Sequence, residues 1–300
     1  MTRRFRFGVL CTASTLAGWR ETARKAEDLG FATLVAQDHF GEQLSPLPCL
    51  VAAAAVTTRL RFGTIALDND FRHPAVLAKE AASVDVLTGG RFELGIGAGW
   101  LDADYEKTGI EFAPGAVRMR RLAETVRVCR AFFAGESVTL HGEHYRIESL
   151  DAFPRPMQAR LPLLIGGRQR RMLSYAAREA DIVSISMLDA RSPAAPPPPG
   201  FAVKAAWVKE AAGPRFEEID LHANCFGAEV TDKASEALQR IAERIGATPE
   251  QALENPANLV GSVDAIVEQL EGWRERTGLS YASLRPEVME AFAPVIARLA

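Results

Sequence analysis

Asp38 and His39 are the adjacent residues of this chain that are best suited to acid–base chemistry. They follow Gln37 at the end of the strand predicted for residues 32–36, so both side chains stand at a strand end. Histidine exchanges a proton near neutral pH, which makes His39 the best single candidate for a chemical role. The alternative is a histidine that bonds to the backbone and only orients a loop. The sequence leaves both interpretations open.

A run of glycines, Gly95, Gly97 and Gly99, lies at the end of another predicted strand. Its spacing is similar to that of the dinucleotide-binding fingerprint, but the third glycine comes one residue early. Gly109 and Pro114 follow soon after and exclude the long helix that the fingerprint opens. We therefore expect these glycines to let the backbone approach something flat or charged.

A second glycine motif, Gly166-Gly167-Arg168, follows a buried strand and opens a predicted helix. Backbone N–H groups and the helix dipole at such a position favour an anion, and Arg170 and Arg171 add positive charge. Phosphate binding is the functional interpretation. The alternative is a glycine turn with arginines on a solvated helix face.

Two further polar clusters have weaker patterns. Asp68 and Asp70, on either side of an asparagine, could hold Mg²⁺, but the calcium-loop spacing is missing and helix capping is the favoured interpretation. Asp220, His222 and Asn224 alternate with apolar residues along one strand, so all three would face the same side. They could form a polar floor below an active site or a satisfied network in the core.

No pattern in the chain predicts a metal site. The four cysteines (Cys11, Cys49, Cys129 and Cys225) show no paired spacing, and they indicate the reduced thiols of a cytoplasmic protein. His141 and His144 flank a predicted hairpin turn, where surface histidines are favoured over a metal pair.

Strand-like and helical segments alternate along the 300 residues. Hydrophobic periodicity predicts strands at residues 5–11, 32–36, 60–67, 92–96, 163–165, 181–185, 219–226 and 281–284. It predicts helices at residues 16–29, 46–57, 74–87, 116–133, 168–178, 201–212, 233–245, 263–277 and 287–299. Eight strands joined mostly through helices indicate an α/β fold, the (β/α)₈ or TIM barrel, as one domain over residues 1–300. An open doubly wound sheet is the alternative.

The alternation of strands and helices is interrupted at residues 135–162, which we interpret as an insertion before the fifth barrel strand. It contains a hairpin with strands at 138–140 and 144–147. Residues 193–200 include four consecutive prolines and predict a stiff extended spacer. In such a barrel the active site lies at the C-terminal ends of the strands, where Asp38, His39 and both glycine motifs fall.

The composition is that of a globular protein, with 48% hydrophobic and 24% charged residues. The net charge of -3 argues against a nucleic-acid partner, which would need a basic surface. The longest apolar stretch, residues 49–56, is too short to span a bilayer, so we expect no membrane partner.

Several motifs together resemble the bacterial luciferase-like monooxygenase superfamily. They are DHF at 38–40, FRHPAVLAK at 71–79, LTGGRFELGIGAGW at 87–100, PLLIGG at 162–167 and LVGSVDAI at 259–266. The motifs occur in order over nearly the whole chain. Within the superfamily, the chain is similar to the actinobacterial group of coenzyme F420-dependent oxidoreductases.

The resemblance implies a homodimeric barrel that binds a small-molecule substrate and the deazaflavin coenzyme F420, or FMN as the alternative. It implies a backbone bulge in the Ile65-Ala66 region, which in this family often contains a non-proline cis peptide, against the back face of the cofactor ring. His39 would be the acid or base, oriented by Asp38, and Cys11, Trp100 and Tyr105 would line the substrate pocket. The implied cofactor-binding residues are Asp38, His39, Ile65, Ala66, Asp68, Gly97, Ala98, Gly99, Gly166, Gly167, Arg168 and Ser184.

The chain departs from members of the superfamily that oxidise a sugar phosphate. Those carry a glutamate where Trp100 stands, a tryptophan in place of residues 42–44 and a lysine that is missing from residues 186–188. We therefore expect hydride transfer between F420 and an organic substrate without a phosphate. The alternatives are a reduced-FMN-dependent monooxygenase that uses O2 and a non-catalytic flavin-binding barrel.

Overall fold

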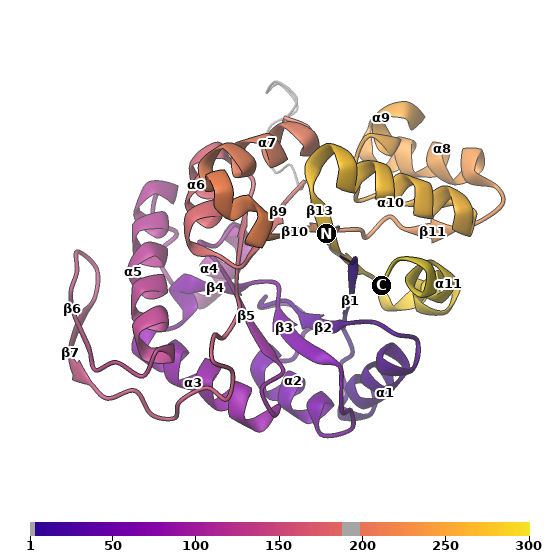
Figure 1. Ribbon diagram of the computed structural model, residues 1–300. Coiled ribbons are helices and arrows are strands. Elements are labelled where there is room, and N and C mark those ends of the chain that lie inside the picture. The colour runs from indigo at the N-terminus through magenta and orange to yellow at the C-terminus, as the bar shows by residue number, and fades with distance from the viewer. Residues whose placement is uncertain (1–3, 188–198) are drawn as a thin grey trace. The chain divides into compact units, whose positions relative to one another are not determined.

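The computed structural model describes residues 4–187 and 199–300 (Figure 1). The chain forms two compact units. Unit 1 comprises Met1–Cys11, Lys25–Thr33 and Gly166–Ala300, and unit 2 comprises Thr12–Arg24 and Leu34–Ile165. Most residues of the predicted proline spacer, 193–198, lie outside the described residues. Within the described ranges no helix has the length and apolar character needed to cross a membrane.

Unit 2 contains parallel strands that were predicted from periodicity. They are β2 (Thr33–Ala36), β3 (Arg61–Thr64), β5 (Phe92–Gly97) and β8 (Leu163–Gly167), with Thr33 and the two glycines of β8 assigned to unit 1. Phe62 pairs with Phe92, and Leu94 pairs with Leu163. These apolar strand residues are fully buried or nearly so, as expected for parallel strands covered on both faces.

The strand predicted for residues 60–67 is interrupted. It ends as β3 at Thr64 and resumes as β4 (Leu67–Asp68), with a cis peptide bond between Ile65 and Ala66. The cis bond that the family resemblance implied is therefore confirmed. β4 pairs with the end of β5, Leu67 with Ile96 and Asp68 with Gly97, so Asp68 is placed beside the glycine run.

The helices of unit 2 are amphipathic and bury one face. They are α2 (Pro46–Ala54), α3 (Pro74–Leu87), α4 (Asp102–Thr108) and α5 (Gly115–Phe133), with a short 3-10 turn η1 (Asn69–Phe71). Along α5 the buried residues include Leu122, Val126, Cys129 and Phe132. Helix α1 (Leu16–Asp28) runs from unit 2 into unit 1.

The predicted insertion forms a hairpin of β6 (Val138–His141) and β7 (Arg146–Leu150), which projects from the end of α5 in Figure 1. β7 begins and ends later than the predicted 144–147. The buried carboxylate of Glu124 anchors the turn because it accepts the backbone N–H groups of residues 143–145. Asp85 likewise accepts the N–H groups of Met157 and Gln158. Two buried carboxylates thus fasten the insertion to the body of unit 2.

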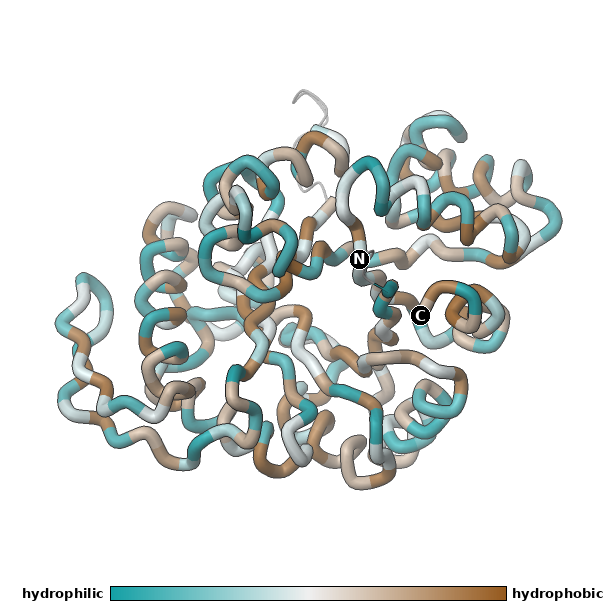
Figure 2. Tube along the Cα trace, in the orientation of Figure 1, coloured by the Kyte–Doolittle hydropathy of each residue, from teal (hydrophilic) through white to brown (hydrophobic). Residues whose placement is uncertain are grey.

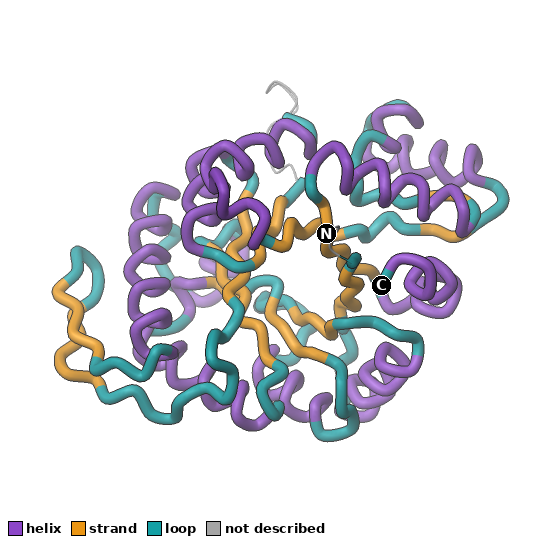
Figure 3. Tube along the Cα trace, viewed as in Figure 1, coloured by secondary structure: helices purple, strands orange, loops and turns teal. Residues whose placement is uncertain are grey.

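Unit 1 contains four parallel strands in the order β1 (Arg6–Leu10), β13 (Leu279–Leu284), β10 (Asp220–Asn224) and β9 (Ile182–Ile185). The helices of unit 1 include α6 (Arg170–Glu179) after β8, α7 (Phe201–Ala212) after β9, α10 (Val263–Thr277) before β13 and α11 (Met289–Leu299) after β13. Ser262 caps α10 and Gly278 ends it in a left-handed conformation. Figure 3 shows the alternation of strands and helices, and Figure 2 shows hydrophobic and hydrophilic residues around successive turns of the helices.

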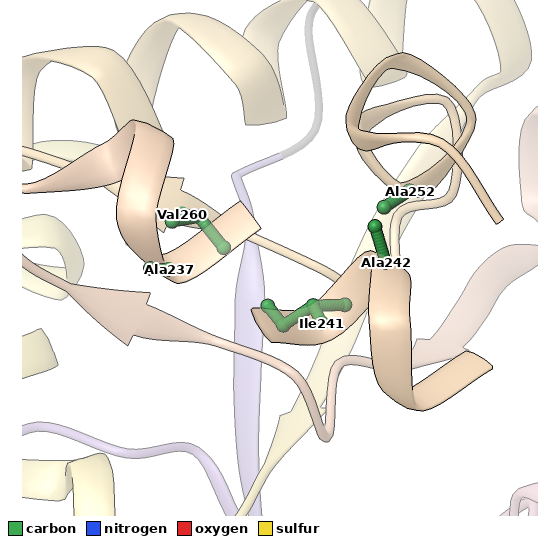
Figure 4. Packing of buried hydrophobic residues seen from close by; sticks show 5 residues of the cluster. All are labelled: Ala237, Ile241, Ala242, Ala252 and Val260. Carbon is green, nitrogen blue, oxygen red and sulfur yellow. The ribbon is translucent and has the colours of Figure 1, made fainter. Parts of the chain in front are cut away.

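One part of unit 1 was only partly predicted. Between β10 and α10 lie β11 (Glu229–Val230), α8 (Ala234–Ile245), α9 (Pro249–Leu253) and β12 (Val260–Gly261), of which only α8 was expected. The two short strands pair in parallel. Residues of α8, α9 and β12 build a small apolar cluster of their own, shown in Figure 4: Ala237, Ile241, Ala242, Ala252 and Val260.

Candidate active site

The polar residues predicted at the strand ends of unit 2 do lie together. Asp38 and His39 follow β2, Asp68 ends β4, and Gly97 ends β5. The short helix α4 comes directly after the glycine run and supplies two more side chains, Asp104 and Tyr105, both buried. These residues and the contacts among them all lie within unit 2.

The partner of His39 is Asp104. Oδ2 of Asp104 lies 2.7 Å from Nδ1 of His39, and Oδ1 accepts the backbone N–H of Phe40 at 3.0 Å. The carboxylate is 5% exposed and the imidazole 19%. The expectation that Asp38 orients His39 is therefore wrong. The orienting carboxylate comes from a helix 65 residues further along the chain.

Asp38 is engaged elsewhere. Nη1 of Arg72 donates to Oδ2 of Asp38 at 2.6 Å, and Nη2 donates to Oδ1 at 3.3 Å, so the ion pair is bidentate. Oδ2 also accepts the backbone N–H of Asp68 at 3.2 Å. Asp38 thus links the end of β2 to the end of β4, and its charge is compensated by Arg72.

Asp68 and Tyr105 form a second contact between α4 and a strand end. The hydroxyl of Tyr105 donates to Oδ1 of Asp68 at 2.8 Å, and the same oxygen accepts the N–H of Asp70 at 3.0 Å, which caps η1 as predicted. Burial raises the pKa of Asp68 to about 6, against the lowering effect of these hydrogen bonds. Burial and the nearby charge of Asp68 raise the pKa of Tyr105. Tyr105 is 1% exposed, so its assignment to the surface of a substrate pocket is corrected: it packs beneath the strand ends.

The glycine run is held close to its neighbours, which explains two of its three glycines. A Cβ on Gly95 would lie 1.8 Å from the carbonyl oxygen of Thr64, and one on Gly99 would lie 1.9 Å from the Tyr105 hydroxyl. The guanidinium of Arg118 donates to the carbonyl oxygens of Ala98 and Gly99 at 2.7 and 2.5 Å, which fixes this backbone. Gly97 differs, because its added Cβ would meet the Cβ of Ala66 at 3.9 Å, an ordinary contact.

Trp100 lies against His39. Their ring centroids are 5.7 Å apart and the rings are perpendicular, while 46% of Trp100 stays exposed. Phe40 and Leu44, in the loop after His39, are also about half exposed. An apolar surface therefore borders the imidazole, as the predicted pocket role of Trp100 requires.

The remaining predicted site residues belong to unit 1. Gly166 and Gly167 end β8, Arg168 follows before the start of α6, and all three are half-buried. The neighbouring Arg170 pairs with Glu210 at 2.9 Å on the surface. Cys11 is 3% exposed, so it presents little surface to a substrate.

Ser184 lies in a buried network with His222 and Ser283. Its Oγ is 2.9 Å from Nδ1 of His222, whose Nε2 is 2.9 Å from Oγ of Ser283. Burial, with a smaller effect of the Arg6 charge, lowers the pKa of His222 to about 3, so the ring is neutral. The polar residues of β10 were interpreted either as a polar floor below an active site or as a hydrogen-bonded network in the core. For His222 the core network is correct, because both of its ring nitrogens have partners. The hydroxyl of Ser184 is used in that network.

Among the described residues, no group of three or more histidine, cysteine or acidic side chains is arranged to hold a metal ion. His141 pairs with Glu148 at 2.8 Å on the exposed hairpin. His144 is held by its backbone N–H, which donates to Glu124 at 3.2 Å.

The sequence interpretation missed two residues that organise the site, Asp104 and Arg118. The signal for Asp104 was the short helix itself, since Asp102 lies in its first turn and Gly109 ends it in a left-handed conformation. No comparable local signal exists for Arg118, whose contacts with residues 98 and 99 depend on the packing of α5.

Comparison with known proteins shows the family of the chain. Residues 4–295 match the family model described as luciferase-like monooxygenase. The chain belongs to the luciferase-like monooxygenase family. The F420-dependent glucose-6-phosphate dehydrogenase of Microbacterium testaceum is 34% identical over 165 residues, which are 52% of this chain and 48% of that protein. This luciferase-like chain thus matches the curated relatives over about half of their length.

Solved structures show the fold of this luciferase-like protein over its whole length. The coenzyme F420-dependent tetrahydromethanopterin reductase from Methanopyrus kandleri has a TM-score of 0.79 at 18% identity, with 100% of both chains covered. A type II Baeyer-Villiger monooxygenase from Pseudomonas putida in complex with FMN has a TM-score of 0.72 at 18% identity, covering 99% of this chain and 96% of that one. The predicted (β/α)₈ barrel fold is confirmed.

Proposed function

We propose that this luciferase-like protein is an oxidoreductase that transfers hydride between coenzyme F420 and a small organic substrate. Support comes from two proteins similar to this chain whose names specify F420, a dehydrogenase and a reductase. One observation carries the proposal: Asp38, the residue before His39, accepts the backbone N–H of Asp68, which pairs with Gly97 where β4 and β5 end in small residues.

That surface fits a flat ring. Ala66, Gly97 and Ala98 are small residues at adjoining strand ends, and all three are half-buried, so their backbone is accessible. Asp68 of β4 pairs with Gly97 of β5. Arg118 donates to the carbonyl oxygens of the next two residues, Ala98 and Gly99. Glycine and alanine carry no long side chain, so a ring system can approach such a backbone closely. Ile65, Ala66, Asp68, Gly97, Ala98 and Gly99 are the residues that we propose to hold it.

When bound, the deazaflavin supplies the hydride chemistry, and the protein supplies binding, orientation and proton transfer. His39 is the proposed acid or base, since its ring is partly accessible and borders the apolar surface of Trp100. Asp38 holds the end of β2 through Arg72 and thereby supports the cofactor surface. Gly166, Gly167 and Arg168 of unit 1 are proposed to bind phosphate through backbone N–H groups and the start of α6.

Trp100 distinguishes the proposed substrate from a sugar phosphate. Its indole is about half exposed and packs edge-to-face on His39. Unlike the glutamate that sugar-phosphate-oxidising members carry at this position, an indole cannot exchange a proton with a substrate. It also makes this side of the proposed substrate pocket apolar. We therefore propose an uncharged or weakly polar organic substrate, and a homodimer, which family resemblance alone supports.

A reduced-FMN-dependent monooxygenase is the second candidate, because an FMN-bound monooxygenase shares the fold over nearly the full chain. A reduced flavin activates O2, whereas a deazaflavin transfers hydride. A non-catalytic flavin-binding barrel is the third candidate, and it would bind a cofactor without turnover on any substrate.

Cofactor titration with a glycine variant tests the proposal. The apoprotein is titrated with F420 and with FMN, and binding is followed by fluorescence. Gly97→Val should abolish binding, because the valine side chain would occupy the ring surface, yet it should leave the melting temperature close to that of the wild type. Gly115→Val, at the start of α5, is the matched control and should bind normally. Binding of FMN but not F420, or normal binding by Gly97→Val, would contradict the proposal.

A further inference from the structure

We propose that Asp104 is a positioning residue that sets which nitrogen of His39 carries the proton. The proposal rests on the proposed acid–base function for its catalytic meaning, while the tautomer itself can be measured without any activity. The starting observation is the 2.7 Å contact between Oδ2 of Asp104 and Nδ1 of His39. This contact joins α4 to the loop after β2.

An ionised carboxylate can only accept hydrogen bonds. Nδ1 of His39 must therefore carry the hydrogen in this contact, and the neutral ring leaves Nε2 unprotonated. Oδ1 of the same carboxylate accepts the N–H of Phe40, so two consecutive residues, 39 and 40, donate to Asp104. The carboxylate is 5% exposed, so water competes little for either oxygen.

The ring is also held against rotation. Trp100 packs perpendicular to His39, with centroids 5.7 Å apart, and it precedes the helix that carries Asp104. The next residue of that helix, Tyr105, is fastened to Asp68 at 2.8 Å. Two adjacent buried side chains of α4 therefore form hydrogen bonds next to strand ends, Asp104 after β2 and Tyr105 at β4. The imidazole of His39 cannot turn over without breaking its contact with Asp104.

No residue in the described ranges forms a hydrogen bond with Nε2 of His39, so this nitrogen is left to contact a bound molecule. In the neutral ring Nε2 accepts a proton, and in the protonated ring it returns one. Asp38 cannot take the role of Asp104, since both of its oxygens are bonded to Arg72.

The test is ¹⁵N NMR of histidine-labelled protein, in which the ring nitrogen shifts report the tautomer directly. The chain has five histidines, and His39→Gln assigns the signals of His39 by their loss. Wild-type His39 should be the Nδ1–H tautomer. In Asp104→Asn the amide can donate to Nδ1, and the population should move to Nε2–H. Asp38→Asn should leave the tautomer unchanged.

A wild-type spectrum with His39 as Nε2–H, or an Asp104→Asn spectrum like the wild type, would overturn the proposal. The wild-type spectrum decides even if the variant does not fold. With turnover established, Asp104→Asn should lower kcat by at least about tenfold, and the double variant with His39→Gln should be no slower than His39→Gln alone. Asp102→Asn, exposed on the first turn of the same helix, should keep wild-type kcat. Absence of hydride transfer with either cofactor would refute the proposed function and leave the tautomer result standing.

Discussion

The hydroxyl of Tyr105 donates a hydrogen bond to Oδ1 of Asp68 across 37 residues of sequence. Tyr105 is almost fully buried, and its ring also packs on Phe71 and Phe112 with centroids 5.4 and 4.7 Å away. This one bond fixes α4 to the end of β4. It thereby links the support of His39 to the backbone that is proposed to lie under a cofactor ring.

Removing that bond should destabilise unit 2. Tyr105→Phe keeps the packing and deletes the donor, so the free energy of unfolding should fall by about 1–2 kcal/mol. Chemical denaturation measures the change. A double-mutant cycle with Asp68→Asn isolates the pair, and strictly additive effects would show that the bond contributes nothing.

Asp68 should make stability depend on pH in a direction opposite to that of an ordinary paired carboxylate. Its pKa in the folded protein is about 6, above the value of 3.8 expected when unfolded. The folded state therefore binds more protons between these values, and this contribution to stability is full below about pH 3.8 and is lost as pH rises towards 6. Wild type should lose stability relative to Asp68→Asn over that window. A constant difference in unfolding free energy would contradict the shift.

His222 should act in the other direction. Its pKa of about 3 lies below the value of 6.5 for the unfolded chain, so the unfolded state binds the extra proton. The stability contribution is full above about pH 6.5 and decreases as pH falls towards 3. Thermal melts of His222→Asn should show a weaker acid dependence than the wild type. His141→Asn, on the exposed hairpin, controls for the loss of one histidine.

His39 should matter for turnover more than for folding or cofactor binding. His39→Gln removes the proton-transferring nitrogen, so kcat should fall roughly 10²–10⁴-fold. Steady-state kinetics with bound cofactor measure the effect, and His141→Gln serves as the control. Turnover of His39→Gln close to that of the wild type would contradict the acid–base role of His39.

Much of the fold was predictable because most elements are long enough to show periodicity. Helix α10 is an example, since its apolar spacing, Ser262 cap and Gly278 terminator all lie in the local sequence. Short elements were missed. Helix α4 has seven residues, and β11 and β12 have two each, so all three are shorter than the stretch over which a hydrophobic period can be recognised.

The candidate site was predicted as a set of strand ends but not as a set of contacts. His39 and Asp38 are adjacent in sequence, which suggested a pair, yet successive residues in an extended chain point in opposite directions. The partners that the fold supplies are Asp104 for His39 and Arg72 for Asp38. Such pairings depend on how α4 and the loop after β4 pack, and no local pattern encodes them.

Oxygen consumption during reaction with the reduced cofactors tests the proposed chemistry most directly. The protein is mixed with reduced F420 or reduced FMN in air-saturated buffer, with and without a panel of apolar organic acceptors, while an electrode records O2. Hydride transfer by F420 predicts oxidation of the cofactor that requires an acceptor and takes up no O2. Uptake of O2 that requires the protein and reduced FMN, with no reaction of reduced F420, would contradict it.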